Sequence, residues 1–563
     1  VEKDLIKENE IEIALKRLMT ARFKLGMFDP PGKVHYARIA FSANDTEKHN
    51  RLALKVAQES MVLLKNDNNT LPLKKNLTTI AVIGPYADNL DILLGNYHGT
   101  PSNPVTILEG IKNKVSKNTE VIYAQGIIPV ENFGMMKTLE MKNLRPSENQ
   151  TGFGLTGEYF DNPNLEGSPV FVRVDTIMAP YWGLESPGEG IPNDHFSVRW
   201  TGKIIAPYSG KYEIGIITDD KGRFYFNDEL VVDNWDPNEI NVMKTFESDM
   251  EEGKEYPIKI EYADEVEYAG IRFQWRKIEE MADNSPLIAE AVELANRSDI
   301  TVVVAGISPK LEGEEMPVEM DGFEGGDRTH LKIPKPMQVL VTTLYATGKP
   351  VILVLTSGSA LAVNWESEHI PAILQVWYPG QQGGNAVADV LFGDYNPAGR
   401  LPVTFYKSVE DLPPFEDYNM EGRTYRYFHG DPLYPFGHGL SYSSFKYEKV
   451  DLTAYEVSEN DAINVSVTLR NTGDYDGDEV VQLYVRDVES AETQPIKSLK
   501  GFKRVFIKKG KTTTIEIPLE INDLSYYDEG KGDFVVDPGV FELQIGASSS
   551  DIRLKTHLIV REN

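Results

Sequence analysis

The spacing of apolar residues predicts that this chain opens with an amphipathic helix. Ile11, Leu15, Leu18 and Phe23 recur at helical spacing, and glycine and proline residues follow at 26–31, where the helix is expected to stop. The apolar face of such a helix needs a surface to pack on, because it is not stable in water.

A second pattern, of short continuous apolar runs between periodic helices, occupies 31–147 and returns at 281–406. The expected helices and strands are 52–64, 79–84, 286–297, 300–306, 336–347, 351–357 and 372–378. Continuous apolar runs are typical of parallel strands that are buried on both faces. We therefore expect 31–147 and 281–406 to form one α/β sandwich domain around a parallel-rich sheet.

Strict alternation of apolar and polar residues marks two further regions. Residues 148–280 alternate between turns and predict a β-sandwich inserted into the α/β domain, since exposed loops tolerate insertions. A packed linker rich in proline and tyrosine is expected at 407–442. Residues 443–563 alternate at the spacing of an immunoglobulin-like sandwich. The predicted fold class is thus multidomain, α/β plus all-β.

Composition narrows the choice of partners. The 563 residues correspond to roughly three or four domains. The formal charge of −29 repels phosphate backbones and anionic lipids, and no run of about 18 apolar residues occurs, so neither nucleic acid nor a membrane is expected as a partner. A neutral ligand such as a sugar fits this charge. The absence of cysteine excludes disulfides and cysteine nucleophiles, but it leaves the compartment open.

Most local signals for catalysis or metal binding are weak. The residues around Ser357 lack the spacing of a nucleophile elbow, and the nine histidines include no H-E-x-x-H pair. The glycine-rich stretches 322–327 and 394–399 do not match phosphate-binding loops. Asp219 and Asp220 are too few for a Ca²⁺ cage and are interpreted as a surface turn. We expect no cofactor and no metal.

The acidic loop after the strand at 300–306 is the strongest candidate for chemistry. It carries Glu312, Glu314 and Glu315, and ligand crevices in open α/β sheets lie outside the carboxyl ends of the strands. Glycosidases use two carboxyl groups, and neighbouring negative charges in general favour the protonated form that an acid needs. The alternative is a solvated surface, since the chain has 86 acidic residues.

Short motifs spread over most of the chain carry a family resemblance. They are 51–65, TLPL at 70–73, IAVIGPYA at 80–87, WYPGQ at 377–381, 388–402 and YPFGHGLSY at 434–442. Together they resemble the C-terminal part of glycoside hydrolase family 3, and the resemblance covers 1–147 and 281–563. The sequence at 311–328 is most similar to the β-xylosidase and β-glucosidase branch. The motifs at 157–160, 207–212 and 218–220 resemble a protective-antigen-like sugar-binding module, which we expect at 148–280.

The resemblance implies a retaining, exo-acting hydrolase built from a TIM barrel, an α/β sandwich and a fibronectin type III-like domain, the last at 443–563. Only the last barrel helix and a linker are expected here, at 1–30, so the nucleophilic aspartate is expected to be absent from this chain. The family's acid/base glutamate follows a strand and a Gly-x-x-Pro turn, which places it at Glu312, with Glu314 as the rival. Tyr97 and His98 are candidates for binding the sugar.

The expected function is therefore hydrolysis of β-linked oligosaccharides from plant polysaccharides, by a β-xylosidase first and a β-glucosidase second. This chain would supply the acid/base loop, and its partners would be the glycoside substrate and the missing barrel segment, with a homodimer left open. The alternative is a non-catalytic carbohydrate-binding or scaffold protein. A periplasmic or extracellular location is expected.

Overall fold

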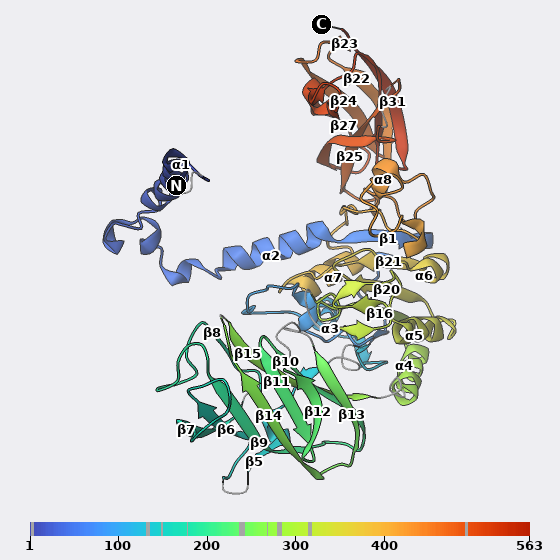
Figure 1. The fold of residues 1–563 in the computed structure, drawn as a ribbon. Coiled ribbons are helices and arrows are strands. Elements are labelled where there is room, and N and C mark those ends of the chain that lie inside the picture. Colours follow the sequence, from blue (N-terminus) through green and yellow to red (C-terminus); the bar gives the residue numbers. More distant parts are fainter. Residues whose placement is uncertain are drawn as a thin grey trace.

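The chain forms three bodies, which Figure 1 shows as the α/β body in the middle, a green β-sandwich below it and a red β-sandwich above it. The computed structural model describes residue 1 and residues 5–130, 136–147, 150–176, 178–235, 243–266, 268–278, 284–313, 318–489 and 494–562. The predicted fold class, α/β plus all-β, is confirmed.

A six-stranded sheet forms the centre of the α/β body. Its order is β1 (Val62–Asn66), β21 (Ala372–Gln375), β20 (Val351–Thr356), β16 (Ile300–Gly306), β2 (Thr79–Ile83) and β3 (Glu120–Ala124). Neighbouring strands are parallel except β1, which runs antiparallel to β21. The sheet combines strands from both sides of the inserted region, so the two halves of the host complete one core.

Helices flank this sheet in two groups. On one side α3 packs on α7 and α7 on α2, whereas α4 packs on α5 and β3. The bounds are α2 (Glu47–Ser60), α3 (Ile107–Lys114), α4 (Ser285–Arg297), α5 (Lys335–Tyr345), α6 (Asn364–His369) and α7 (Gly383–Leu391). Every residue of β16, β20 and β21 is buried, because these helices cover the sheet.

The helix predicted at 52–64 ends earlier than expected. It stops at Ser60, and Val62–Asn66 is strand β1, in which Val62 pairs with Gln375. Local spacing favours a helix through this segment, but a strand lets Met61, Val62 and Leu63 become fully buried beside β21. Tertiary pairing therefore overrides the helical period here.

The inserted body is a sandwich of two antiparallel sheets. One sheet contains β4 (Lys137–Thr138), β8 (Tyr181–Gly183), β10 (Gly210–Thr218), β13 (Lys244–Met250) and β15 (Ala269–Ile278). The other contains β5 (Leu144–Pro146), β6 (Leu155–Phe160), β7 (Phe171–Asp175), β9 (Ser197–Ile205), β11 (Lys221–Phe226), β12 (Glu229–Asn234) and β14 (Glu255–Ala263). Large aromatic side chains such as Trp200, Phe224 and Phe273 are fully buried between the sheets.

Two details of this sandwich differ from the sequence-based expectation. Strands β4 and β5 precede 148 yet pair with β15 and β9, so the sandwich begins before the expected boundary. These strands are two and three residues long, too short for a periodic signal. The turn at Asp219 and Asp220 is not an open surface turn, because Asp220 is 8% exposed and accepts a hydrogen bond from the Glu265 amide.

The C-terminal body is a second sandwich. Its sheets contain β22 (Phe445–Leu452), β24 (Ala462–Asn471) and β27 (Thr512–Glu520), and β23 (Glu456–Val457), β25 (Gly477–Asp487), β26 (Ser498–Ile507), β30 (Gly539–Gly546) and β31 (Ile552–Val560). A separate hairpin is formed by β28 (Tyr526–Asp528) and β29 (Asp533–Val535). Residues before this body include the short helix α8 (Thr424–Tyr427), and the Tyr442 hydroxyl donates to the Val390 carbonyl, so this linker is packed.

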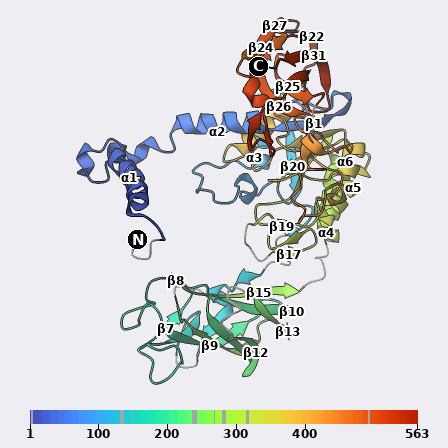
Figure 2. The same ribbon diagram turned by 45° about the horizontal axis from the view of Figure 1, so that its top comes forward.

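Helix α1 (Glu8–Lys24) and the residues up to the start of α2 stand away from the three bodies in both views (Figures 1 and 2). The helix predicted from the apolar spacing is present, and it ends just before Gly26, whose φ is +71°. None of its residues is buried, and the Phe23 side chain is 64% exposed. Within the described residues, the apolar face of α1 has no surface to pack on.

Candidate active site

Strand β16 brings the acidic loop to the carboxyl edge of the sheet. The strand ends at Gly306, which has a φ of +134°, and a Cβ atom there would lie 2.1 Å from the Thr356 carbonyl oxygen. Only glycine fits this turn. The Glu312 amide then donates to the Ser308 carbonyl at 3.2 Å, which closes a second turn and fixes where the Glu312 side chain begins.

Three hydrogen-bond donors hold the Glu312 carboxylate. The Gly358 amide donates to Oε2 at 2.7 Å. The Ser359 hydroxyl donates to Oε1, and the Tyr378 hydroxyl donates to Oε2. Gly358 and Ser359 follow β20 and Tyr378 follows β21, which are the next two strands of the sheet beyond β16. The parallel order of the sheet therefore gathers groups that lie far apart in the sequence.

Tyr378 and Arg328 set the electrostatics around this carboxylate. Burial raises the pKa of the Tyr378 hydroxyl far above its usual value, and the charge of Glu312 raises it further, so Tyr378 stays a proton-bearing donor. Arg328 donates to the Ser359 hydroxyl at 3.0 Å and to the His330 carbonyl at 3.1 Å. Burial lowers the pKa of the Arg328 guanidinium while the Glu312 charge opposes this, and the group remains cationic.

This arrangement suits a carboxylate that accepts hydrogen bonds. An ionised carboxyl group is acceptor-only, and both oxygens of Glu312 are occupied by donors. A general acid must carry a proton and point it at the leaving oxygen. In this arrangement Glu312 ties the ends of three strands together, and its second acceptor site on Oε1 is the one that these donors leave open.

The predicted sugar-binding residues lie on a segment that reaches this loop. The Asn96 side chain donates to the Glu312 carbonyl at 2.8 Å, so the 96–98 segment adjoins the loop. Tyr97 has a φ of +59° and is 89% exposed. The His98 ring contacts the Gly99 carbonyl through Nδ1 at 2.9 Å. The structure thus brings the segment, through Asn96, beside the loop and leaves the Tyr97 side chain facing solvent.

The described residues after the acidic loop return to Gly313. Glu314 and Glu315 lie outside the described residues. Beyond them, β17 (Glu319–Met320), β18 (Phe323–Glu324) and β19 (Asp327–Arg328) form a small antiparallel sheet. The turn between β18 and β19 is tight against the loop, since a Cβ on Gly326 would lie 1.5 Å from the Gly313 carbonyl oxygen.

Glu324 differs from Glu312 in its surroundings. Its side chain is exposed on β18, and among the described residues it takes part in no hydrogen bond or ion pair. Its cross-strand partners are Glu319 and Asp327. The Glu324 carboxyl group is therefore more open to a ligand than that of Glu312, which is half-buried and holds three donors.

Sequence reasoning did not identify Tyr378, Ser359, Arg328 or Asn96 as parts of this site. A usable signal existed for the first two, because each closely follows an apolar run predicted as a strand. Arg328 and Asn96 lie in loops, where no periodic pattern points to them.

The described residues contain neither a metal-binding cluster nor a membrane-spanning helix. Among the described residues, no three or more His, Asp or Glu side chains form a group suited to a metal ion. In the same part of the chain, no helix has the length and apolar character needed to cross a membrane.

Comparison with known sequences identifies the family. Residues 61–442 match the glycosyl hydrolase family 3 C-terminal domain, and residues 479–549 match a fibronectin type III-like domain. The chain therefore belongs to glycoside hydrolase family 3.

Individual relatives are named as two kinds of glycosidase. The chain is 38% identical over 560 residues to the xylan 1,4-beta-xylosidase of Xylanibacter ruminicola, covering 99% of this chain and 63% of that protein. It is 29% identical to the periplasmic beta-glucosidase of Salmonella typhimurium, covering 97% of this chain and 55% of that protein. The chain thus spans between about half and two thirds of the length of these relatives.

A solved structure agrees with this assignment. The beta-glucosidase from Kluyveromyces marxianus in complex with glucose superposes with a TM-score of 0.66 at 30% identity, over 92% of this chain and 63% of that chain. The predicted family resemblance is confirmed.

Proposed function

We propose that this chain is the C-terminal part of a retaining exo-β-glycosidase that removes terminal sugars from plant-polysaccharide oligosaccharides. The observation that carries the proposal is the loop after β16, which places carboxylates at the carboxyl edge of the family 3 sheet. The formal charge of −29 also suits a neutral substrate. β-Xylosides are the favoured substrates because the 38% identical relative is named a xylan 1,4-beta-xylosidase.

The chain supplies the acid/base loop and lacks the nucleophile in this proposal. Retaining glycosidases place two carboxyl groups about 5–5.5 Å apart on either side of the scissile bond. The missing aspartate belongs to the barrel segment that the family resemblance implies, and the exposed apolar face of α1 is where we expect that segment to pack.

Within the loop, we assign the acid/base role to Glu324 and a holding role to Glu312. Glu312, the residue predicted from the sequence, has both oxygens engaged by donors. Glu324 is exposed on β18, whose following turn lies against Gly313, and its oxygens are open to a glycosidic oxygen. The assignment of Glu312 itself as the acid/base is the alternative, and it would use the acceptor site on Oε1 that the three donors leave open.

A β-glucosidase is the second candidate, supported by the names of the Salmonella and Kluyveromyces proteins. A non-catalytic carbohydrate-binding protein gains no support from these relatives. A periplasmic or extracellular location is proposed from the printed name of the Salmonella relative.

The test measures the hydrolysis of three chromogenic substrates, an aryl β-xyloside, an aryl β-glucoside and an aryl α-arabinoside. It compares the native protein with a chain that contains residues 1–563 alone. We expect the native protein to turn over the β-xyloside fastest and the 1–563 chain to be inactive. Full activity of a chain verified to contain only these residues would refute the division into two catalytic parts. Preference for the β-glucoside would replace the substrate and leave the division standing.

A further inference from the structure

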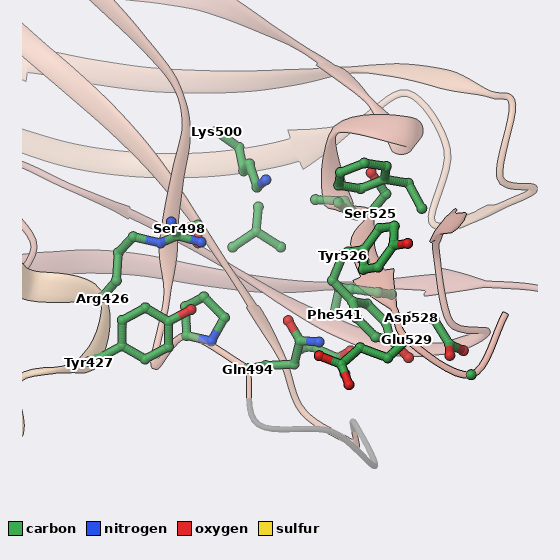
Figure 3. A pocket seen from close by; sticks show the side chains of 17 residues that line it. Arg426, Tyr427, Gln494, Ser498, Lys500, Ser525, Tyr526, Asp528, Glu529 and Phe541 are labelled. Atoms are coloured by element: carbon green, nitrogen blue, oxygen red, sulfur yellow. The ribbon is translucent and has the colours of Figure 1, made fainter. Parts of the chain in front are cut away.

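A cavity in the C-terminal body lies apart from the acidic loop. Its volume is about 530 Å³, which is within the range of pockets that bind small ligands. Side chains from α8, from the start of β26 and from the β28–β29 hairpin line it (Figure 3). None of these elements takes part in the candidate active site.

One end of this cavity is cationic. Arg426 of α8 and Lys500 of β26 lie at the same side of the cavity in Figure 3. The Lys500 ammonium donates a hydrogen bond to the Asp523 carbonyl. Burial lowers the pKa of Lys500, and the neighbouring Arg426 charge lowers it further. Among the described residues neither cation forms an ion pair, in a chain with 57 basic and 86 acidic side chains.

The remaining walls carry aromatic rings and hydrogen-bond acceptors. Tyr427 and Tyr526 present ring surfaces that could pack against the C–H faces of a sugar, and the Phe541 ring behind them is buried. Asp528 and Glu529 lie across the cavity from the two cations in Figure 3. Asp487 also belongs to the lining, and its Oδ1 already accepts from the Glu489 amide at 3.1 Å.

The lining requires three properties of a ligand. An anionic group would complement Arg426, which is exposed, and Lys500, since neither cation forms an ion pair among the described residues. Hydroxyl groups suit Glu529 and Asp528 because carboxylates only accept hydrogen bonds, although Asp528 already accepts from the Lys531 amide at 3.0 Å. A compact ring with apolar faces suits the aromatic walls. A simple inorganic anion would satisfy only the first property, and a neutral sugar would leave the cations unmatched.

We propose that this cavity binds a uronate, a sugar that carries a carboxylate, with the carboxylate against Arg426 and Lys500 and the hydroxyl groups toward Asp528 and Glu529. The site is distinct from the catalytic loop and does not depend on which glutamate is the acid. An oligosaccharide with an acidic branch would be held by this body while a neutral end is presented elsewhere.

The test is ligand-observed saturation-transfer NMR on the full chain with sodium glucuronate, xylose, acetate, phosphate and glycine as separate probes. Arg426→Gln and Lys500→Met remove the cations one at a time from two different elements. Lys503→Met is the matched control, because Lys503 is an exposed lysine on the same strand β26 that does not line the cavity. Thermal unfolding of each variant confirms folding.

We expect saturation transfer to glucuronate and at least a fivefold loss of affinity in Arg426→Gln and in Lys500→Met, with Lys503→Met unchanged. Xylose and glycine should give no signal, and acetate or phosphate at equal concentration should not displace glucuronate. Equal binding of xylose, displacement by acetate or phosphate, stronger binding of glycine, or an unchanged affinity in whichever cation variant folds would overturn the proposal.

Discussion

At the scale of the residue, three hydrogen-bond donors hold the Glu312 carboxylate in place. Hydrogen bonds to charged groups stabilise a fold by about 1.5–3 kcal/mol each, because the charge is otherwise left without its partner. Tyr378→Phe removes one of the three donors while keeping the ring. We expect the free energy of unfolding to fall by about 1.5–3 kcal/mol, measured by urea denaturation.

The control for this variant is Tyr418→Phe, since the Tyr418 side chain is 94% exposed. Its free energy of unfolding should change by less than about 0.5 kcal/mol. Equal effects of the two substitutions would show that Tyr378 does not stabilise the charge of Glu312.

The sequence predicts residues of this site that follow a local pattern, but not contacts between distant segments. Glu312 is visible as an acidic residue after an apolar run, because the strand is local. The ends of the apolar runs point to Ser359 and Tyr378 as edge residues, but their contact with Glu312 is not visible, since it depends on the order of strands in the sheet. Spacing did not single out the proposed Glu324, because exposure on β18 is not encoded in the pattern.

At the scale of the element, the turn after β16 provides a test of backbone strain. In Gly306→Ala the new methyl group would lie 2.1 Å from the Thr356 carbonyl oxygen at a φ of +134°. We expect a loss of at least about 3 kcal/mol in the free energy of unfolding, measured by denaturation. Gly348→Ala, at a φ of +74° with open space around it, should cost only about 1 kcal/mol. Similar costs would mean that the turn is not as close-packed as described.

The inserted sandwich should lose stability as the pH rises. Burial raises the pKa of Asp219 to about 6 and that of Asp264 to about 7, against about 3.9 in an unfolded chain. The folded state therefore holds these protons more tightly, so their contribution is complete below the unfolded pKa and is lost as the pH rises through 6 and 7. Hydrogen exchange in β9 and β14 should be faster at pH 8 than at pH 5, after correction for intrinsic rates.

Asp264→Asn is the matched variant for this pH dependence. It removes one titrating group while keeping a side-chain oxygen that can accept from the His195 amide. The difference in exchange between pH 5 and pH 8 should shrink in Asp264→Asn. An unchanged difference would contradict the role of Asp264.

Element prediction from the sequence succeeded where a segment repeats one period over a sufficient length. The long alternating strands and the continuous run of β16 were predictable, and so was α1. The sequence pattern placed a helix over 62–64, where pairing with β21 makes a strand. It also missed β4 and β5, which are strands only because β15 and β9 offer them partners.

At the scale of the whole molecule, α1 is a helix that has no buried residue among those the structure describes. A 17-residue helix with no buried residue is marginal on its own in water. We expect amide hydrogens of 8–24 to exchange rapidly in the 1–563 chain and at least tenfold more slowly in the native protein, where the proposed barrel covers the helix. Equal exchange, followed by mass spectrometry, would contradict a covering segment. Exchange in β16 serves as the control and should be slow in both.

The most direct test of the central claim measures azide rescue in the native protein with an aryl β-xyloside that has a good leaving group. Removing the acid/base carboxyl of a retaining enzyme stalls hydrolysis of the glycosyl-enzyme, and azide, which needs no general base, can replace water. Glu324→Gln should lose about 10²–10⁴-fold in hydrolysis and regain rate with azide, forming β-xylosyl azide. Glu312→Gln should be destabilised and give no azide product. Azide product from Glu312→Gln but not from Glu324→Gln would contradict the account.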